Sequence, residues 1–171
     1  MNASITLPHL ARRAQPSPAP CPSEVATNRK RVLIAEDDAV VRAALAAVLE
    51  SEGYDVDVAA DGHQAVLHAA AQPPDLVLLD LNMPCVDGWT ASTKLDHVCP
   101  LLPVIIRARP QQYPEAVRLG VDAFMEKPLD FPVLLRAIRK FTHEPEKRHT
   151  ERITARGFVT RRLNGNNANH S

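Results

Sequence analysis

Residues 76–84 read LVLLDLNMP, and this stretch decides the fold. Its apolar run has the length and composition of a short strand buried on both faces, which is typical of parallel sheets in α/β proteins. The run ends at Asp80, so a carboxylate is placed at the carboxyl end of a buried strand. Ligands of open α/β sheets bind at that edge. The stretch therefore predicts both a parallel sheet and a functional carboxylate.

Two further apolar runs end in charged side chains. Residues 32–35 are followed by three acids, Glu36 to Asp38, and residues 123–126 are followed by Lys127. One carboxylate at such an edge could attack phosphorus, a second acidic group could hold a divalent cation, and an ammonium could pair with phosphoryl oxygens. The three strand ends together indicate phosphoryl chemistry.

Strands and helices alternate from residue 31 onward. The expected strands are 32–35, 54–59, 76–79, 103–106 and 123–126, and the expected helices are about 39–52, a second from residue 61, 88–98, 114–119 and a last one capped by Asp130. Asp38 is expected to cap the first helix, where an acid also suits the helix dipole. Five strands alternating with five helices predict an α/β fold, with a doubly wound five-stranded parallel sheet and helices on both faces.

The two ends of the chain differ in composition from its centre. Residues 1–29 are Pro-rich and predict a disordered leader, residues 30–144 form the domain, and residues 145–171 predict a basic, Asn-rich flexible tail. The central segment carries 11 Lys and Arg against 17 Asp and Glu, a net charge of −6 that favours cation binding, whereas the tail carries six against two. The basic tail is the one segment from which nucleic-acid binding could come.

The lack of a recognisable targeting signal and the spacing of the cysteines predict a cytoplasmic protein. No apolar run approaches the ~20 residues of a membrane span, and the N-terminal segment lacks the apolar core of a signal peptide. The three cysteines, Cys21, Cys85 and Cys99, show no CxxC spacing, which argues against a disulfide framework or a zinc site and for a reducing compartment.

The chain from about residue 31 to 142 resembles the receiver domain of two-component response regulators. The resemblance rests on four pieces in order: the acids after 32–35, residues 78–84, Asp87-Gly88 and Lys127-Pro128. It implies the flavodoxin-like strand order 2-1-3-4-5 and a cis bond before Pro128. The residues after the domain are too few for a typical DNA-binding output domain, so the expectation is a stand-alone receiver.

The resemblance also implies a role for each site residue. Asp80 would be the phosphoacceptor, taking a phosphoryl group from a phosphohistidine, and Lys127 would pair with the acceptor and then with the phosphoryl group. Mg²⁺ is the implied cofactor, with this ligand set: Glu36, Asp37, Asp80 and the backbone carbonyl of Asn82. The implied partners are a histidine kinase or a histidine phosphotransfer protein and a downstream protein that the sequence does not identify, without a membrane.

One position departs from the family pattern. After the fourth strand the family has Thr or Ser, but this chain has Ala108 followed by Arg109, and the segment to Lys127 is shortened. Phe124 fits the aromatic position that normally moves with the missing hydroxyl, so the acceptor chemistry looks retained while the switch looks damaged. Arg109 could donate to phosphate as a forked cation, or it could simply face solvent.

Three functions compete. The leading hypothesis is a phosphorylatable signalling module of a two-component phosphorelay that signals through protein contacts and has no turnover on a free substrate. The alternative is a degenerate receiver that acts as a phosphate-independent interaction scaffold, which Ala108 favours. A haloacid-dehalogenase-like phosphatase is disfavoured, because that class uses Asp-x-Asp and the residue two after Asp80 is Asn82.

Overall fold

The computed structural model describes residues 29–83, 88–144 and 160–163. The strands are β1 Arg31–Ala35, β2 Asp55–Ala59, β3 Leu76–Asp80, β4 Val104–Ala108, β5 Ala123–Glu126 and β6 Arg161–Leu163. The helices are α1 Ala39–Ser51, α2 Gly62–Ala71, α3 Gly88–Val98, α4 Tyr113–Leu119 and α5 Phe131–Thr142, with a 3₁₀ turn, η1, at Pro110–Gln112. Residues 1–28 of the predicted leader, most of the predicted tail, Pro84, Cys85 and Asp87 lie outside the described residues.

All six strands pair in parallel in the order β2-β1-β3-β4-β5-β6. The predicted order of the first five strands is therefore confirmed. The sixth strand was not predicted: residues 161–163 lie within the segment expected to be a flexible tail, yet they pair with β5, so that Ala123 aligns with Arg161 and Met125 with Leu163. The tail strand thus covers the edge that β5 would otherwise leave open.

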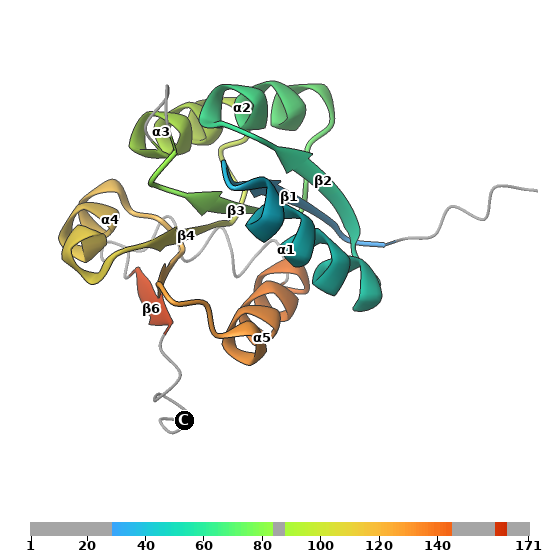
Figure 1. Cartoon of the computed structure of the whole chain (residues 1–171). Helices are drawn as coiled ribbons and strands as arrows, with labels where there is room; N and C mark the ends of the chain where they lie inside the picture. The colour runs from blue at the N-terminus through green and yellow to red at the C-terminus, as the bar shows by residue number, and fades with distance from the viewer. Residues whose placement is uncertain (1–28, 84–87, 145–159, 164–171) are drawn as a thin grey trace, which may run out of the picture.

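Helices cover both faces of the sheet (Figure 1). On one face α1 and α5 pack against alternate residues of β1, β3, β4 and β5, and on the other face α2, α3 and α4 pack against the remaining ones. The amphipathic pattern of α5 shows why it docks: its buried residues recur at helical spacing, at Val133, Leu134, Ala137, Ile138 and Phe141. Each large apolar side chain that is fully buried contributes roughly 1.5–3 kcal/mol to folding.

The helices begin where acidic side chains accept from free backbone N–H groups. Asp38 accepts from the N–H groups of Val40 at 2.8 Å and Val41 at 3.1 Å, and Asp130 accepts from Val133 at 3.0 Å. Both predicted caps are confirmed. A cap of this kind stabilises a helix by about 1 kcal/mol, and the cap on α1 fixes the direction in which the chain leaves the acidic end of β1.

Side-chain alternation decides which residues reach the site. Leu76 and Leu78 of β3 pack on the α1/α5 face, so Asp80, two residues further on, projects to that face as well. Ile105 of β4 also packs there, and the pairing of the two strands aligns Asp80 with Arg107. The carboxyl ends of β3 and β4 therefore place the acidic residue Asp80 beside the basic residue Arg107.

In the part of the chain that is described, no helix is long and apolar enough to cross a membrane.

Candidate functional site

Asp80 is the last residue of β3 and is only 2% exposed. Its Oδ1 accepts from the backbone N–H of Asn82 at 3.0 Å, and its Oδ2 accepts from the Nζ of Lys127 at 2.6 Å. A carboxylate held in this way is oriented by one backbone donor and one charge-assisted bond. The pairing that the sequence predicted between Asp80 and Lys127 is thus present in the structure.

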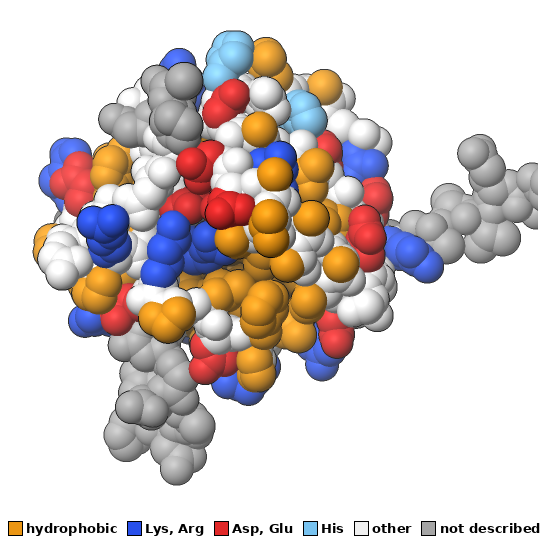
Figure 2. All heavy atoms as spheres, viewed as in Figure 1, with side chains coloured by type: hydrophobic (Ala, Val, Ile, Leu, Met, Phe, Trp, Pro, Cys, Tyr) orange, Lys and Arg blue, Asp and Glu red, His pale blue; other side chains and the backbone are white. Residues whose placement is uncertain are grey.

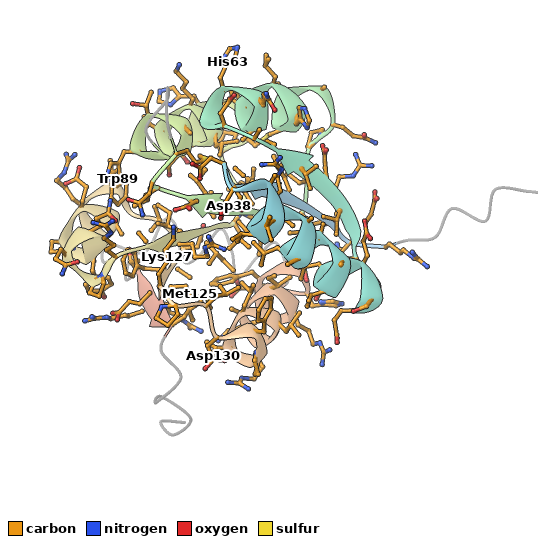
Figure 3. All side chains as sticks on the ribbon, viewed as in Figure 1. Asp38, His63, Trp89, Met125, Lys127 and Asp130 are labelled. Carbon is orange, nitrogen blue, oxygen red and sulfur yellow. The ribbon has the colours of Figure 1, made fainter. Side chains whose placement is uncertain are left out.

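Carboxylates from two strand ends converge at this edge. Glu36 is buried and Asp37 is exposed, and with Asp80 they offer three oxygens that lie within 4.8 Å of one another. Figure 2 shows acidic and basic side chains side by side on this face, and Figure 3 shows Lys127 below Asp38 at the same end of the sheet. Hard oxygen ligands in this number suit Mg²⁺, which keeps several waters and takes one or two carboxylates. The donor set therefore fits the ion that the sequence led us to expect.

A buried arginine stands in the same cluster and was missed by the sequence prediction. Arg107 of β4 is 4% exposed. Its guanidinium contacts the carboxylate of Glu36, and its Nη2 lies 3.5 Å from Oδ2 of Asp80. For Arg109 the sequence left open a phosphate donor or a solvent-facing side chain; Arg109 is exposed, and its backbone N–H donates to the side chain of Gln112.

Burial and neighbouring charges act on the pKa of Glu36 in opposite directions. Burial raises the pKa of the Glu36 carboxyl above its ordinary value, and the nearby charge of Asp80 raises it further, while Arg107 and Lys127 act in the opposite direction. The two cations therefore offset part of the cost of holding Glu36 ionised in a buried place, but burial remains the larger effect.

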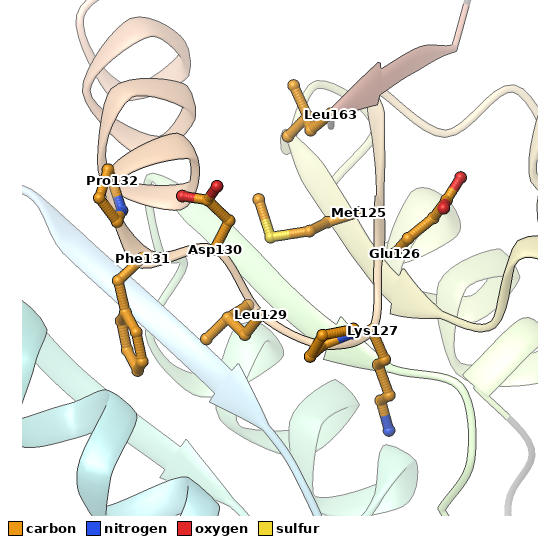
Figure 4. Close-up of a pocket in the computed structure, with 9 residues that line it drawn as sticks. Met125, Glu126, Lys127, Leu129, Asp130, Phe131, Pro132 and Leu163 are labelled. Atoms are coloured by element: carbon orange, nitrogen blue, oxygen red, sulfur yellow. The ribbon is translucent and has the colours of Figure 1, made fainter. Parts of the chain in front are cut away.

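Lys127 reaches the site because of the loop that follows β5. The Lys127–Pro128 peptide bond is cis, as the family resemblance implied, and the Lys127 N–H donates to the carbonyl of Ala108 at 3.0 Å. In Figure 4 the Lys127 side chain leaves the loop on the side away from Leu163. On the other side, a hollow of about 590 Å³ is lined by the loop together with Met125 and Leu163. The loop thus separates the cluster around Asp80 from β6.

The residues at the predicted switch positions lie on the other face of the sheet. Ala108 and Phe124 are both fully buried among the apolar side chains of the α2/α3/α4 face. The Phe124 ring meets the ring of Tyr113 edge-on, with a centroid distance of 5.3 Å and an interplanar angle of 65°. The position at which the family has a hydroxyl is therefore apolar here, and the aromatic side chain is packed inward.

The tail strand holds the same aromatic pair from outside. The Tyr113 hydroxyl donates to the carbonyl of Thr160 at 3.3 Å, and the Arg162 guanidinium lies 5.1 Å from the centre of the Tyr113 ring. Arg162 also pairs with Glu126 at the end of β5. Nothing in the composition of residues 145–171 indicated these contacts, which depend on pairing between distant segments.

Gly88 explains part of the predicted motif. A Cβ on Gly88 would lie 2.7 Å from the backbone carbonyl oxygen of Asp80 and 2.8 Å from the Cα of Leu81. The start of α3 therefore packs directly on the backbone of Asp80 and Leu81, and only glycine allows this approach.

The comparison with known families agrees with this geometry. Residues 32–139 match the response regulator receiver domain. The chain therefore belongs to the receiver domain family of two-component response regulators. Receiver domains are signalling modules that histidine kinases or phosphotransfer proteins phosphorylate, and they bind Mg²⁺ at an acidic pocket.

Individual relatives place the chain within this family. It is similar to the transcriptional regulatory protein PdtaR of Mycobacterium tuberculosis, with 37% identity over 112 residues that cover 64% of this chain and 55% of that protein. It is also similar to the alkaline phosphatase synthesis transcriptional regulatory protein SphR of Synechococcus elongatus, with 30% identity over 138 residues that cover 74% of this chain and 54% of the relative. The chain spans about half the length of these curated relatives.

Solved structures show the same fold. A CheY-like response regulator receiver domain protein from Methanospirillum hungatei superimposes with a TM-score of 0.66 at 28% identity, covering 70% of this chain and 98% of that chain. The receiver domain of the hybrid histidine kinase CckA superimposes with a TM-score of 0.57 at 30% identity, covering 66% of this chain and 99% of that chain.

Proposed function

We propose that Asp80 accepts a phosphoryl group from a phosphohistidine and that the modified domain signals through protein contacts. The observation that carries this proposal is the setting of Asp80. It is a buried carboxylate at a strand end, and its oxygens already lie within reach of Lys127 and of the Glu36 and Asp37 carboxylates. Phosphoryl transfer depends mainly on such positioning and on charge neutralisation.

The transfer exchanges one bond for another. A carboxylate oxygen of Asp80 attacks phosphorus, the bond from phosphorus to the imidazole nitrogen breaks, and the nitrogen keeps the electron pair. Lys127, now bonded to the Asp80 carboxylate, would pair with the phosphoryl oxygens as they arrive. Mg²⁺ bound by Glu36, Asp37, Asp80 and the Asn82 carbonyl would neutralise part of the phosphoryl charge.

The surface beside the acceptor supports a protein as the phosphoryl donor. A hollow of about 600 Å³ joins Asp80 to apolar side chains at the start of α1 and on the loop after β5, among them Val40, Leu129 and Phe131. Val40 is 79% exposed. An apolar surface next to a charged site is typical of a protein contact, and a histidine kinase or histidine phosphotransfer protein is the donor we infer. Such a donor would meet this chain in the cytoplasm.

Intact mass spectrometry tests the acceptor. Incubation with acetyl phosphate and Mg²⁺ should add one phosphoryl group to the wild type and none to Asp80→Asn. Asp96→Asn, which changes an exposed carboxylate on α3 in the same way, is the matched control and should be labelled like the wild type. A labelled Asp80→Asn protein would show that the acceptor is another residue.

A scaffold that works without phosphate is the second candidate. It is favoured by Ala108, which cannot bond a phosphoryl oxygen, and by Arg107, which already contacts Glu36 and lies close to Asp80. The same labelling experiment separates the two functions, because a wild type that stays unlabelled by acetyl phosphate supports the scaffold.

A further inference from the structure

Arg107 occupies a position that a metal ion would share. Its guanidinium contacts Glu36 and lies 3.5 Å from the Asp80 carboxylate, and these are two of the three carboxylates whose oxygens converge in the cluster. The side chains of Arg107, Glu36 and Asp80 line the same hollow. Of the three carboxylates, only that of Asp37 is exposed.

A guanidinium and a divalent cation cannot use the same oxygens fully. Arginine is always charged in proteins, and its fork matches carboxylate geometry. The carboxylates of Glu36 and Asp80 can each interact with the Arg107 guanidinium or with a metal ion. Every contact made by the guanidinium occupies carboxylate lone pairs and neutralises negative charge that a metal ion would otherwise use. The acidic cluster is therefore neutralised in part before any ion binds.

We propose that Arg107 is an internal counter-cation of the acceptor site, which competes with Mg²⁺ for Glu36 and Asp80. This receiver thereby holds its acceptor carboxylate neutralised without metal, and Mg²⁺ binds fully only when the guanidinium leaves the two carboxylates. The proposal deepens the proposed function and rests on it in taking this cluster as the phosphoryl and metal site.

The hydrogen bonding of Arg107 shows why the guanidinium can be displaced. Its Nε is buried and has no acceptor among the described residues. A buried donor without a partner is unfavourable, so the arginine is held by charge and not by a complete set of hydrogen bonds. An ion that takes over the charge of Glu36 and Asp80 removes the main interaction that keeps the side chain in place.

Isothermal titration of the full, unmodified chain with MgCl₂ tests the competition. Arg107→Met, which keeps the length of the side chain and removes its charge, should bind Mg²⁺ about tenfold more tightly than the wild type. Arg109→Met removes an exposed charge two residues away and should stay within about twofold, because exposed charges are screened. Adding Asp37→Ala to Arg107→Met should abolish the gain if the ion binds at this cluster. Equal or weaker binding by Arg107→Met overturns the proposal.

A second variant and a second measurement keep the test decisive. Arg107→Lys retains the charge that competes with the ion, so it should bind Mg²⁺ within about twofold of the wild type; a gain as large as that of Arg107→Met would show that the charge is not what competes, and the proposal fails. Melting in EDTA and in Mg²⁺ should show a small metal effect for the wild type and a large one for Arg107→Met, because metal replaces the missing cation. The Mg²⁺ titration needs no phosphoryl donor, so its result does not depend on phosphorylation. If Arg107→Met binds Mg²⁺ more tightly but acetyl phosphate does not label Asp80 in the wild type, the proposed function is refuted and the competition between Arg107 and Mg²⁺ is not.

Discussion

The proposed acceptor cluster (Glu36, Asp37, Asp80, Arg107 and Lys127) and the region formed by β4, β5 and β6 (the edge) share β4 and the end of β5 but differ in the side chains that they gather there. At the cluster, charged side chains from three strand ends and the loop after β5 meet in a buried place. At the edge, the side chains are apolar or aromatic, and the tail strand covers them. The adjacent residues Arg107 and Ala108 mark the division, because successive residues of a strand point to opposite faces.

The two regions differ in how closely their residues match the pattern that the family resemblance implies. The cluster retains the acids and the lysine and gains a second cation, whereas the edge has lost the hydroxyl that would connect a phosphoryl group to Phe124. A modification shifts a conformational equilibrium only by its differential interaction with the two states. Chemistry at Asp80 and movement at the edge are therefore expected to be weakly coupled in this chain.

The largest expected effect comes from removing the buried cation. Arg107→Met in EDTA should lower the free energy of unfolding by ~3–5 kcal/mol, because it removes the guanidinium that contacts the buried Glu36 carboxylate and one of the two cations beside Asp80. Urea denaturation followed by circular dichroism measures the loss. Arg109→Met, at an exposed position, should change the free energy by less than ~0.5 kcal/mol. If the free energy of unfolding falls by the same amount in both variants, the contacts of Arg107 with Glu36 and Asp80 do not stabilise the fold.

The sequence predicted the strands and the meeting of Asp80 with Lys127, because these follow from runs of apolar residues and from the charged residues at their ends, while the strand order followed from the family resemblance. It missed Arg107 because the fourth strand was expected to end at residue 106, whereas the pairing with β3 continues to Arg107 and the strand itself ends at Ala108. Alternation could have found it: Arg107 lies two residues after buried Ile105 and therefore shares its face. It missed β6 because three residues reading RRL show no apolar period, and only pairing with β5 orders them.

A smaller effect is expected at the edge. Arg162→Ala removes the ion pair with Glu126 and the contact with the Tyr113 ring, and both are partly exposed. Such contacts contribute about 1 kcal/mol or less, so the melting temperature should fall by a few degrees at most. Arg161→Ala changes the neighbouring exposed arginine of the same strand and should be nearly neutral. A loss as large as that of Arg107→Met would show that the tail strand is as important to the fold as the charged cluster.

The smallest expected effect is the response of the edge to modification of Asp80. Because Ala108 cannot bond a phosphoryl oxygen, the wild type lacks a charge-assisted hydrogen bond that would contribute roughly 1.5–3 kcal/mol to the coupling. Addition of beryllofluoride, a phosphoryl mimic, should therefore produce small amide shifts over residues 108–126 of the wild type. Ala108→Thr should produce larger ones, because its hydroxyl can follow the phosphoryl group and draw Phe124 with it. Large shifts in the wild type with no gain in Ala108→Thr would mean that another group carries the coupling, and Arg107, which adjoins both Asp80 and Ala108, is the residue whose removal should then abolish them.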